Sequence, residues 1–267
     1  MPQTEFTAHA ADATLHCVRR GSGAPLLLIM GVAGHQLVWG DAFLERLAEE
    51  FEVITYDHRG IGASSRADEF THDDLVADAV AVLDWAGVVD AHVLGFSMGG
   101  TIAQRLAIEH PERLRTLTLV ATWPDLQDVF GEGVLSFAAA GQAPDPETAT
   151  WILFEANFSK AFAENDENFK RFLAAASAAK VPAPVAMGQV AASATHDVSD
   201  KLEAVDVPTL VVHGTQDAII NASAGERLAD AIPGAKLELW PGLGHHLSWE
   251  ASERLAQSVI DHVKAAD

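Results

Sequence analysis

The sequence predicts an α/β protein with a mostly parallel central sheet and flanking helices. Short, continuously apolar runs, which are typical of strands covered on both faces, alternate along the chain with longer segments of helical periodicity. This alternation favours parallel strands joined by crossover helices. The chain has 267 residues, of which 49% are hydrophobic, so one large domain can bury a substantial core.

The expected strands follow one another in a simple order. Residues 14–20 run into Gly21-Ser22-Gly23, so we expect an antiparallel edge strand that ends in a hairpin turn. Buried strands are then expected at Leu26–Met30, Glu52–Asp57, Ala91–Phe96, Leu114–Ala121, Thr209–His213 and Lys236–Trp240. Amphipathic patterns predict helices over residues 41–50, 73–86, 101–108, 223–231 and 249–263.

The alternation stops over residues 123–200. This stretch is rich in alanine and aromatic residues, has helical character and contains no convincing strand. We interpret it as a helical cap, or lid, inserted into a core formed by residues 1–122 and 201–267.

Composition excludes several functional classes. The formal net charge is −21, from 17 basic and 38 acidic residues, and such a field repels nucleic acid. Cys17 is the single cysteine, which rules out an intrachain disulfide and a cysteine-based metal site. The N-terminus has no signal-peptide pattern, and no apolar run is long enough to span a membrane. We therefore expect a cytoplasmic protein without nucleic-acid or membrane partners.

The strongest chemical signal is Gly95-Phe96-Ser97-Met98-Gly99, a G-x-S-x-G motif. It lies between an apolar strand pattern and a helical pattern, which is the strand–turn–helix context that a nucleophilic serine needs in this motif. Glycines at both ends allow a tight, strained turn. Ser97 is therefore the predicted nucleophile.

A serine hydroxyl needs an adjacent base, and that base needs a carboxylate to orient it. His245 follows the last expected strand and precedes the last helix, so we predict that it is the base, with its neighbour His246 as the alternative. Asp217 lies just beyond the strand Thr209–His213 and is the predicted carboxylate.

The reaction also needs backbone donors and a pocket. The N–H of Met98 and an N–H from the loop after Leu26–Met30, for which Val32 is the candidate, are expected to form the oxyanion hole. The expected pocket residues are apolar or aromatic, apart from one histidine: Met30, Phe96, Trp123, Phe154, Phe158 and His246.

With these residues in place, the whole chain resembles the α/β-hydrolase superfamily. Asp57-His58-Arg59-Gly60-Ile61-Gly62-Ala63-Ser64 looks like its D-x-R-G-x-G-x-S loop, and His110-Pro111-Glu112-Arg113 resembles its H-P-E-R segment. Gly244-His245, with Glu250 further on, is similar to its G-H-x-x-x-x-E signature, which favours His245 over His246. The order Ser97, Asp217, His245 is the family order, although some members carry the acid after an earlier strand, where Asp125 stands here.

Within the superfamily the chain is most similar to aclacinomycin methylesterase-like and 3-oxoadipate enol-lactonase-like proteins. The similarity covers roughly residues 14–122 and 201–267. The methylesterase-like proteins share Trp39 and Tyr56-Asp57-His58-Arg59. The chain departs from the family by having Met30-Gly31 in place of His-Gly, and Ala-Ile-Ile-Asn after Asp217.

The resemblance implies a serine hydrolase that cleaves a small-molecule carboxylic ester or lactone through an acyl-enzyme, without a metal or organic cofactor. The absence of a basic cluster disfavours a dicarboxylate lactone. Alternatives are perhydrolysis, C–C bond hydrolysis or cofactor-free oxygenation on the same fold, or a ligand receptor that keeps the triad. The sequence does not determine the oligomeric state, and a homo-oligomer is one of the options.

Overall fold

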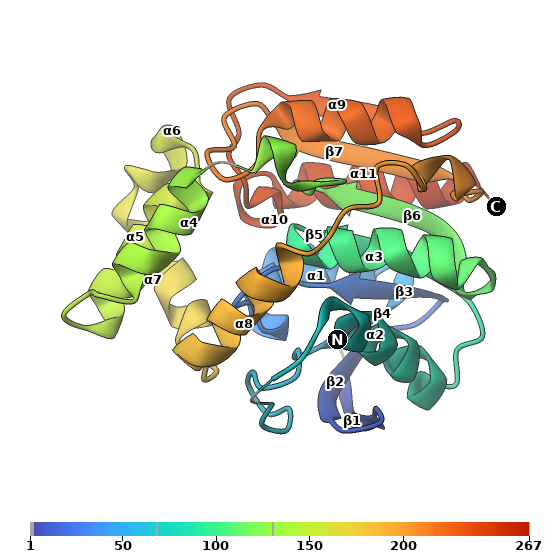
Figure 1. The fold of residues 1–267 in the computed structure, drawn as a ribbon, viewed down its shortest axis with the longest axis horizontal. Helices are drawn as coiled ribbons and strands as arrows, with labels where there is room; N and C mark the ends of the chain where they lie inside the picture. The colour runs from blue at the N-terminus through green and yellow to red at the C-terminus, as the bar shows by residue number, and fades with distance from the viewer. Residues whose placement is uncertain (1–2, 68, 130, 267) are drawn as a thin grey trace.

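The structure, a computed structural model, describes residues 3–67, 69–129 and 131–266. Its centre is an eight-stranded sheet with the order β1-β2-β4-β3-β5-β6-β7-β8 (Figure 1). The β1/β2 and β2/β4 pairs are antiparallel and all other pairs are parallel. The predicted α/β class with a mostly parallel sheet is confirmed. The strands are β1 (Gln3–His9), β2 (Thr14–Gly21), β3 (Ala24–Ile29), β4 (Phe51–Tyr56), β5 (Ala91–Phe96), β6 (Leu114–Val120), β7 (Thr209–Gly214) and β8 (Lys236–Trp240).

The N-terminal part of the sheet differs from the prediction. Residues 14–21 form a strand, but β1 covers its outer side, so β2 is not at the edge. Gly21-Ser22-Gly23 does not close a hairpin, because β2 and β3 both pair with β4, which lies between them. The strand β1 was not predicted, because most of its side chains are exposed and its sequence contains no apolar run.

Helices cover both faces of the sheet (Figure 1). Alternate strand residues face opposite layers: Leu27 and Ile29 pack toward α2, α3 and α9, whereas Leu26 and Leu28 pack toward α1 and α11. The expected helix over 249–263 is interrupted at Ala251, which separates α10 from α11. The flanking helices are α1 (Asp41–Ala48), α2 (His72–Ala86), α3 (Met98–Glu109), α9 (Ala222–Ala231), α10 (Leu247–Glu250) and α11 (Ser252–Lys264).

The chain between β6 and β7 forms helices and turns that extend away from the sheet (Figure 1). We refer to residues 123–200 as the cap. Its helices are α4 (Gly131–Ala140), α5 (Pro146–Asn157), α6 (Lys160–Ala163), α7 (Asp166–Ala176) and α8 (Ala183–Ser193). Across the described residues, no helix combines the length and apolarity needed to cross a membrane.

Candidate active site

Ser97 occupies a sharp turn between β5 and α3. Its backbone has φ +54° and ψ −122°, a conformation that costs a non-glycine residue roughly 1–3 kcal/mol. The turn is held by three hydrogen bonds: the Ser97 N–H donates to the Val120 carbonyl at 3.0 Å, and the Ser97 carbonyl accepts from the Thr122 hydroxyl at 2.7 Å and from the Gly100 N–H at 2.8 Å. The surrounding structure therefore fixes the serine in a strained position at the end of a buried strand.

The two motif glycines are required by close packing. A Cβ at Gly95 would lie 2.3 Å from the Gly99 carbonyl oxygen, and a Cβ at Gly99 would lie 1.9 Å from the Ile29 carbonyl oxygen. Backbone cannot move aside as a flexible side chain can. The G-x-S-x-G spacing is thus a steric requirement for bringing β5, α3 and β3 this close together.

His245 is oriented by Asp217. The His245 Nδ1 lies 2.7 Å from the Asp217 Oδ2, and both side chains are almost fully buried. His245 and Ser97 line the same cavity. The carboxylate thus fixes which imidazole nitrogen faces away from it, as a general base requires.

The Asp217 carboxylate has donors on both oxygens. Oδ1 accepts the N–H groups of Ile219 and Ile220 at 2.9 and 2.8 Å, and Oδ2 also lies 3.2 Å from the His213 Nε2. Burial on its own would raise the pKa of Asp217, but the adjacent His245 and His213 more than offset it and hold the pKa well below its ordinary value. The carboxylate is therefore ionised throughout the physiological range.

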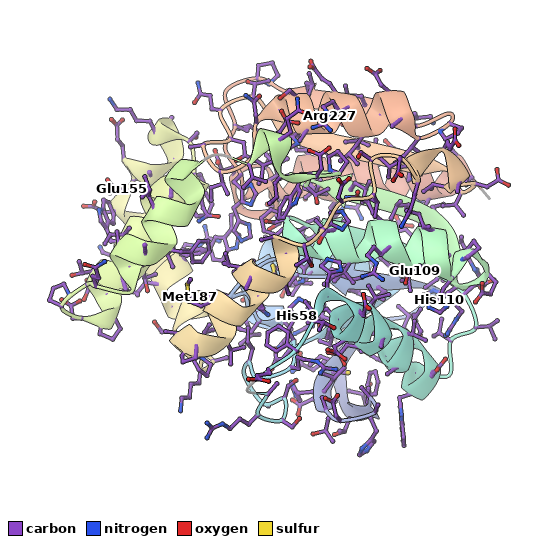
Figure 2. All side chains as sticks on the ribbon, in the orientation of Figure 1. His58, Glu109, His110, Glu155, Met187 and Arg227 are labelled. Carbon is purple, nitrogen blue, oxygen red and sulfur yellow. The ribbon has the colours of Figure 1, made fainter. Side chains whose placement is uncertain are left out.

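The alternative acid and base have other partners. Asp125 caps the short helix Leu126–Asp128 and pairs with Arg227 of α9, which is labelled in Figure 2. His246 has Ser248 near its Nδ1, at 3.2 Å, and stacks on Phe158 with the rings 7° from parallel. Burial, and then the adjacent His245, lower the pKa of His246 to about 3, so that this histidine is neutral. The structure brings Asp217, and not Asp125, to His245.

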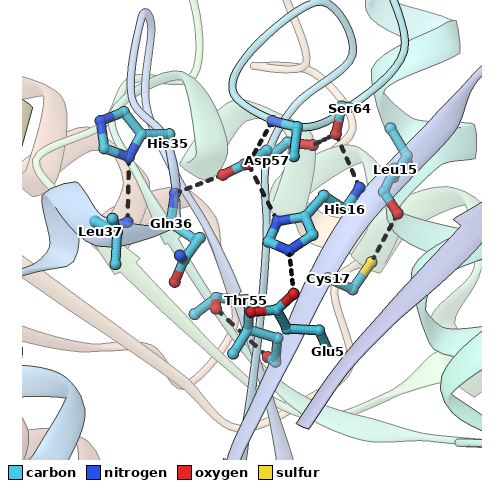
Figure 3. Close-up of polar contacts among 12 residues, drawn as sticks. Glu5, Leu15, His16, Cys17, His35, Gln36, Leu37, Thr55, Asp57 and Ser64 are labelled. Carbon is cyan, nitrogen blue, oxygen red and sulfur yellow. Dashed lines mark hydrogen bonds and ion pairs between the residues drawn. The ribbon is translucent and has the colours of Figure 1, made fainter. Parts of the chain in front are cut away.

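The loop that carries Val32 is braced from the core. His58 Nε2 lies 2.8 Å from the Met30 carbonyl oxygen, and the Gln36 N–H donates to Asp57 Oδ1 at 3.0 Å. Figure 3 shows Asp57 between this loop and His16. The D-x-R-G-x-G-x-S segment thus supports the loop that follows β3. Met98 begins α3 and follows Ser97 directly, and Val32 lines the same cavity as Ser97.

Beneath the cap lies a cavity of about 610 Å³. Ser97, His245 and His246 line it, together with the predicted Met30, Phe96 and Trp123. No Asp, Glu, Lys or Arg is among its described lining residues. Other lining residues, from the cap, are Leu126, Phe137, Leu153, Asn157, Phe172 and Met187, the last labelled in Figure 2.

Two predicted pocket residues lie elsewhere. Phe154 and Phe158 are not among the described lining residues, and both are buried in an aromatic cluster of the cap. Their rings are 4.6 Å apart, and both also pack on Phe172, which does line the cavity. The sequence showed that this stretch is rich in aromatic residues, but it could not distinguish the inner packing of the cap from its cavity wall. The cluster comprises Trp151, Phe154, Phe158, Phe162, Phe169 and Phe172.

The cap is bonded to the histidine loop. The Asn157 carbonyl accepts the N–H groups of His245 and His246 at 2.9 and 3.0 Å. Glu250 accepts from the Gly244 N–H and from the Ser159 N–H with Oε1, at 3.0 and 2.9 Å, and from the Ser159 hydroxyl with Oε2, at 2.6 Å. The glutamate of the G-H-x-x-x-x-E signature therefore joins the cap to the loop that carries His245.

Sequence reasoning missed His213, Asn157 and Gln189. His213 ends a strand pattern and acts through Asp217, while Asn157 contributes a backbone carbonyl whose role no side chain indicates. Gln189 lies in the cap and bonds to a loop 156 residues earlier, which no local pattern could indicate. Nowhere in the described chain do three or more His, Cys, Asp or Glu side chains gather as a metal site.

Comparisons with known proteins identify the fold family of the chain. Residues 24–252 match the family model of the alpha/beta hydrolase fold. The chain is 33% identical to a rhodomycin D methylesterase of Streptomyces peucetius, over 91% of this chain and 92% of that protein. It is 31% identical to a candidate carbamate hydrolase of Azorhizobium caulinodans, over 86% and 87% of the two chains. A crystal structure of a hydrolase from Pseudomonas aeruginosa superposes with a TM-score of 0.85 at 30% identity, covering 97% of this chain and 98% of that one.

Proposed function

The chain belongs to the family of enzymes with the alpha/beta hydrolase fold, and we propose that it hydrolyses an uncharged carboxylic ester or lactone through an acyl-enzyme on Ser97. The observation that carries the proposal is the placement of Ser97 and the Asp217-oriented His245 in the wall of one apolar cavity. A strained nucleophile and a histidine held by a buried carboxylate are the parts that acyl transfer needs.

The proposed steps follow from these groups. Ser97 Oγ attacks the carbonyl carbon while His245 takes its proton, and the oxyanion is stabilised by the backbone N–H groups of Val32 and Met98. His245 returns the proton to the alcohol oxygen as the C–O bond breaks. Water, deprotonated by His245, then attacks the acyl carbon, and His245 returns that proton to Ser97 Oγ as the bond between Ser97 Oγ and the acyl carbon breaks and the acid is released.

The uncharged cavity supports a neutral substrate. A substrate carboxylate or ammonium buried among its described lining residues would find no opposite charge, and burying an unpaired charge is costly. The methylesterase relative points to a simple alcohol as leaving group, and the carbamate relative makes carbamates a useful comparison substrate.

The test is turnover by the Ser97→Ala variant. We expect kcat for p-nitrophenyl esters of increasing acyl length to fall by about 10⁴-fold or more, because the nucleophile is lost. Ser258→Ala, on α11 and bonded to Glu238, is the control and should match the wild type. A Ser97→Ala variant that still turned over at near the wild-type rate would overturn the mechanism. Hydrolysis of carbamates or charged esters in preference to neutral esters would overturn the substrate class.

A further inference from the structure

The loop that carries Val32 contains a tight turn with an unusual residue. The Gly34 N–H donates to the Gly31 carbonyl at 3.2 Å, which closes a β-turn over residues 31–34. Ala33, the third residue of the turn, has φ +58°, whereas Val32 is not among the described residues with positive φ. This combination is that of a type II turn, which ordinarily has glycine at the third position.

The type II conformation is unfavourable for a turn with alanine at its third position. A β-turn changes between types I and II when its central peptide, here Val32–Ala33, flips over. Type I has negative φ at both central residues and accepts alanine without strain. The left-handed conformation costs a residue with a Cβ about 1–2 kcal/mol. Something outside the turn must therefore favour type II.

Gln189 of α8 supplies that interaction. Its Oε1 accepts the Ala33 N–H at 2.8 Å, and this N–H belongs to the central peptide. Gln189 is 0% exposed, so water does not replace the bond. If the Val32–Ala33 peptide flipped while the Gln189 side chain kept its orientation, the Val32 carbonyl would face Oε1. Two acceptors form no hydrogen bond, so the flipped peptide would lose this interaction.

We propose that Gln189 is a positioning residue for the oxyanion hole: it holds the Val32–Ala33 peptide in the type II orientation, and so anchors the turn that carries the preceding Gly31–Val32 peptide, whose N–H is the proposed donor. The inference rests on the proposed function, in which Val32 is a donor to the oxyanion. It gives the cap a part in catalysis that is separate from enclosing the substrate. Gln189 acts through the loop, because it is not among the described cavity-lining residues.

The first test is Gln189→Leu, which keeps the bulk and removes the acceptor. We expect kcat for a neutral ester to fall roughly 10- to 100-fold, less than or comparable with the loss of an entire oxyanion donor, while KM changes little. Binding of a trifluoromethyl ketone, whose serine adduct carries an oxyanion, should weaken by a similar factor. Val185→Ala, another buried change on α8, is the control, and should lower Tm while leaving kcat unchanged.

The second test is rescue. In the Gln189→Leu background, Ala33→Gly should restore most of kcat, because glycine adopts the type II turn without strain and no longer needs the cap to hold it. If Gln189 merely stabilised the cap, a glycine in a core loop would restore nothing. An unrestored kcat, an unchanged kcat in Gln189→Leu, or an equal fall in Val185→Ala would each overturn the inference.

A substrate-independent measurement separates this inference from the proposed function. Hydrogen exchange of the Ala33 amide should be faster in Gln189→Leu than in the wild type, and slow in Val185→Ala. A wild type that turns over no ester would refute the proposed function, whereas unchanged Ala33 exchange in Gln189→Leu would refute the positioning role whatever the substrate.

Discussion

At the scale of single residues, the candidate site depends on one carboxylate with a complete set of donors. Asp217 receives two backbone N–H groups on one oxygen, and His245 and His213 lie beside the other. A carboxylate held in this way cannot rotate without losing several hydrogen bonds. The histidine that depends on it is therefore fixed in both tautomer and orientation.

Asp217→Asn should lower kcat by about 10³- to 10⁴-fold, because an amide can donate to Nδ1 and so favour the wrong tautomer. Asp125→Asn is the matched comparison: it weakens a partly buried ion pair with Arg227, away from His245, and should leave kcat within about twofold. Steady-state kinetics of both variants would check this, and a larger loss in Asp125→Asn would move the acid to that position.

At this scale the sequence predicted those site residues that stand in a motif or follow the end of a strand. Ser97 and His245 stand in recognisable patterns, and Asp217 follows a strong strand. It could not predict the role of His213, because its Nε2 lies beside Asp217 Oδ2 only through the turn that follows β7. It also could not separate Phe154 from Phe172, because a helical period does not say which neighbours a ring will contact.

At the scale of elements, the cap is bonded to two loops of the core. The C-terminal end of α5 holds the histidine loop through Asn157, and α8 holds the loop after β3 through Gln189. Both bonds reach segments that contribute to the proposed chemistry. The arrangement favours a cap whose inner ends stay fixed, whichever parts move to admit substrate.

Glu250→Ala should lower both Tm and kcat. It leaves the Gly244 N–H, the Ser159 N–H and the Ser159 hydroxyl without their acceptor, and each unsatisfied buried donor costs about 1–3 kcal/mol. We expect kcat to fall about tenfold, because Gly244 directly precedes His245. Ser159→Ala loses only one of the three bonds, so an effect as large as that of Glu250→Ala would contradict this account.

The elements themselves were largely predictable where apolar runs are continuous. The strands β3, β5 and β7 follow from such runs, since a strand covered on both faces consists mostly of apolar residues. β1 was not predictable, because an exposed strand with one buried residue has no pattern to detect. The sheet order near β2 was also missed, since pairing across a sheet is not encoded locally.

At the scale of the whole molecule, the cap is also joined to the core through two histidines. His196, just after α8, stacks on His72 of α2 with ring centroids 5.1 Å apart. Burial and then Arg105 lower the pKa of His72 to about 4, while burial, His72 and Arg105 lower that of His196 to about 3. Asp73, which acts on His72, and Asp197 and Asp125, which act on His196, only partly oppose this lowering of the pKa values. Both rings are therefore neutral in the folded protein.

The free energy of unfolding should consequently fall as the pH is lowered from 7.5 to 5. Above pH 6.5 both histidines are neutral in the folded and in the unfolded protein. Below pH 6.5 they bind protons in the unfolded chain but stay neutral in the folded protein, until the pH approaches their lowered pKa values. Between pH 7.5 and pH 5, the free energy of unfolding of His196→Phe, which retains the stacking, should fall by roughly 2 kcal/mol less than that of the wild type. Urea unfolding at both values measures this, and parallel losses in the two proteins would contradict it.

The uncharged cavity has a final consequence for turnover. The proposed reaction converts a neutral substrate into a carboxylate, and the described wall offers that anion no cation to hold it. Outside, a formal net charge of −21 disfavours its return. If the enzyme acts as proposed, we therefore expect the cavity that binds the neutral substrate to release the acid readily, so that the accumulating product inhibits the enzyme little.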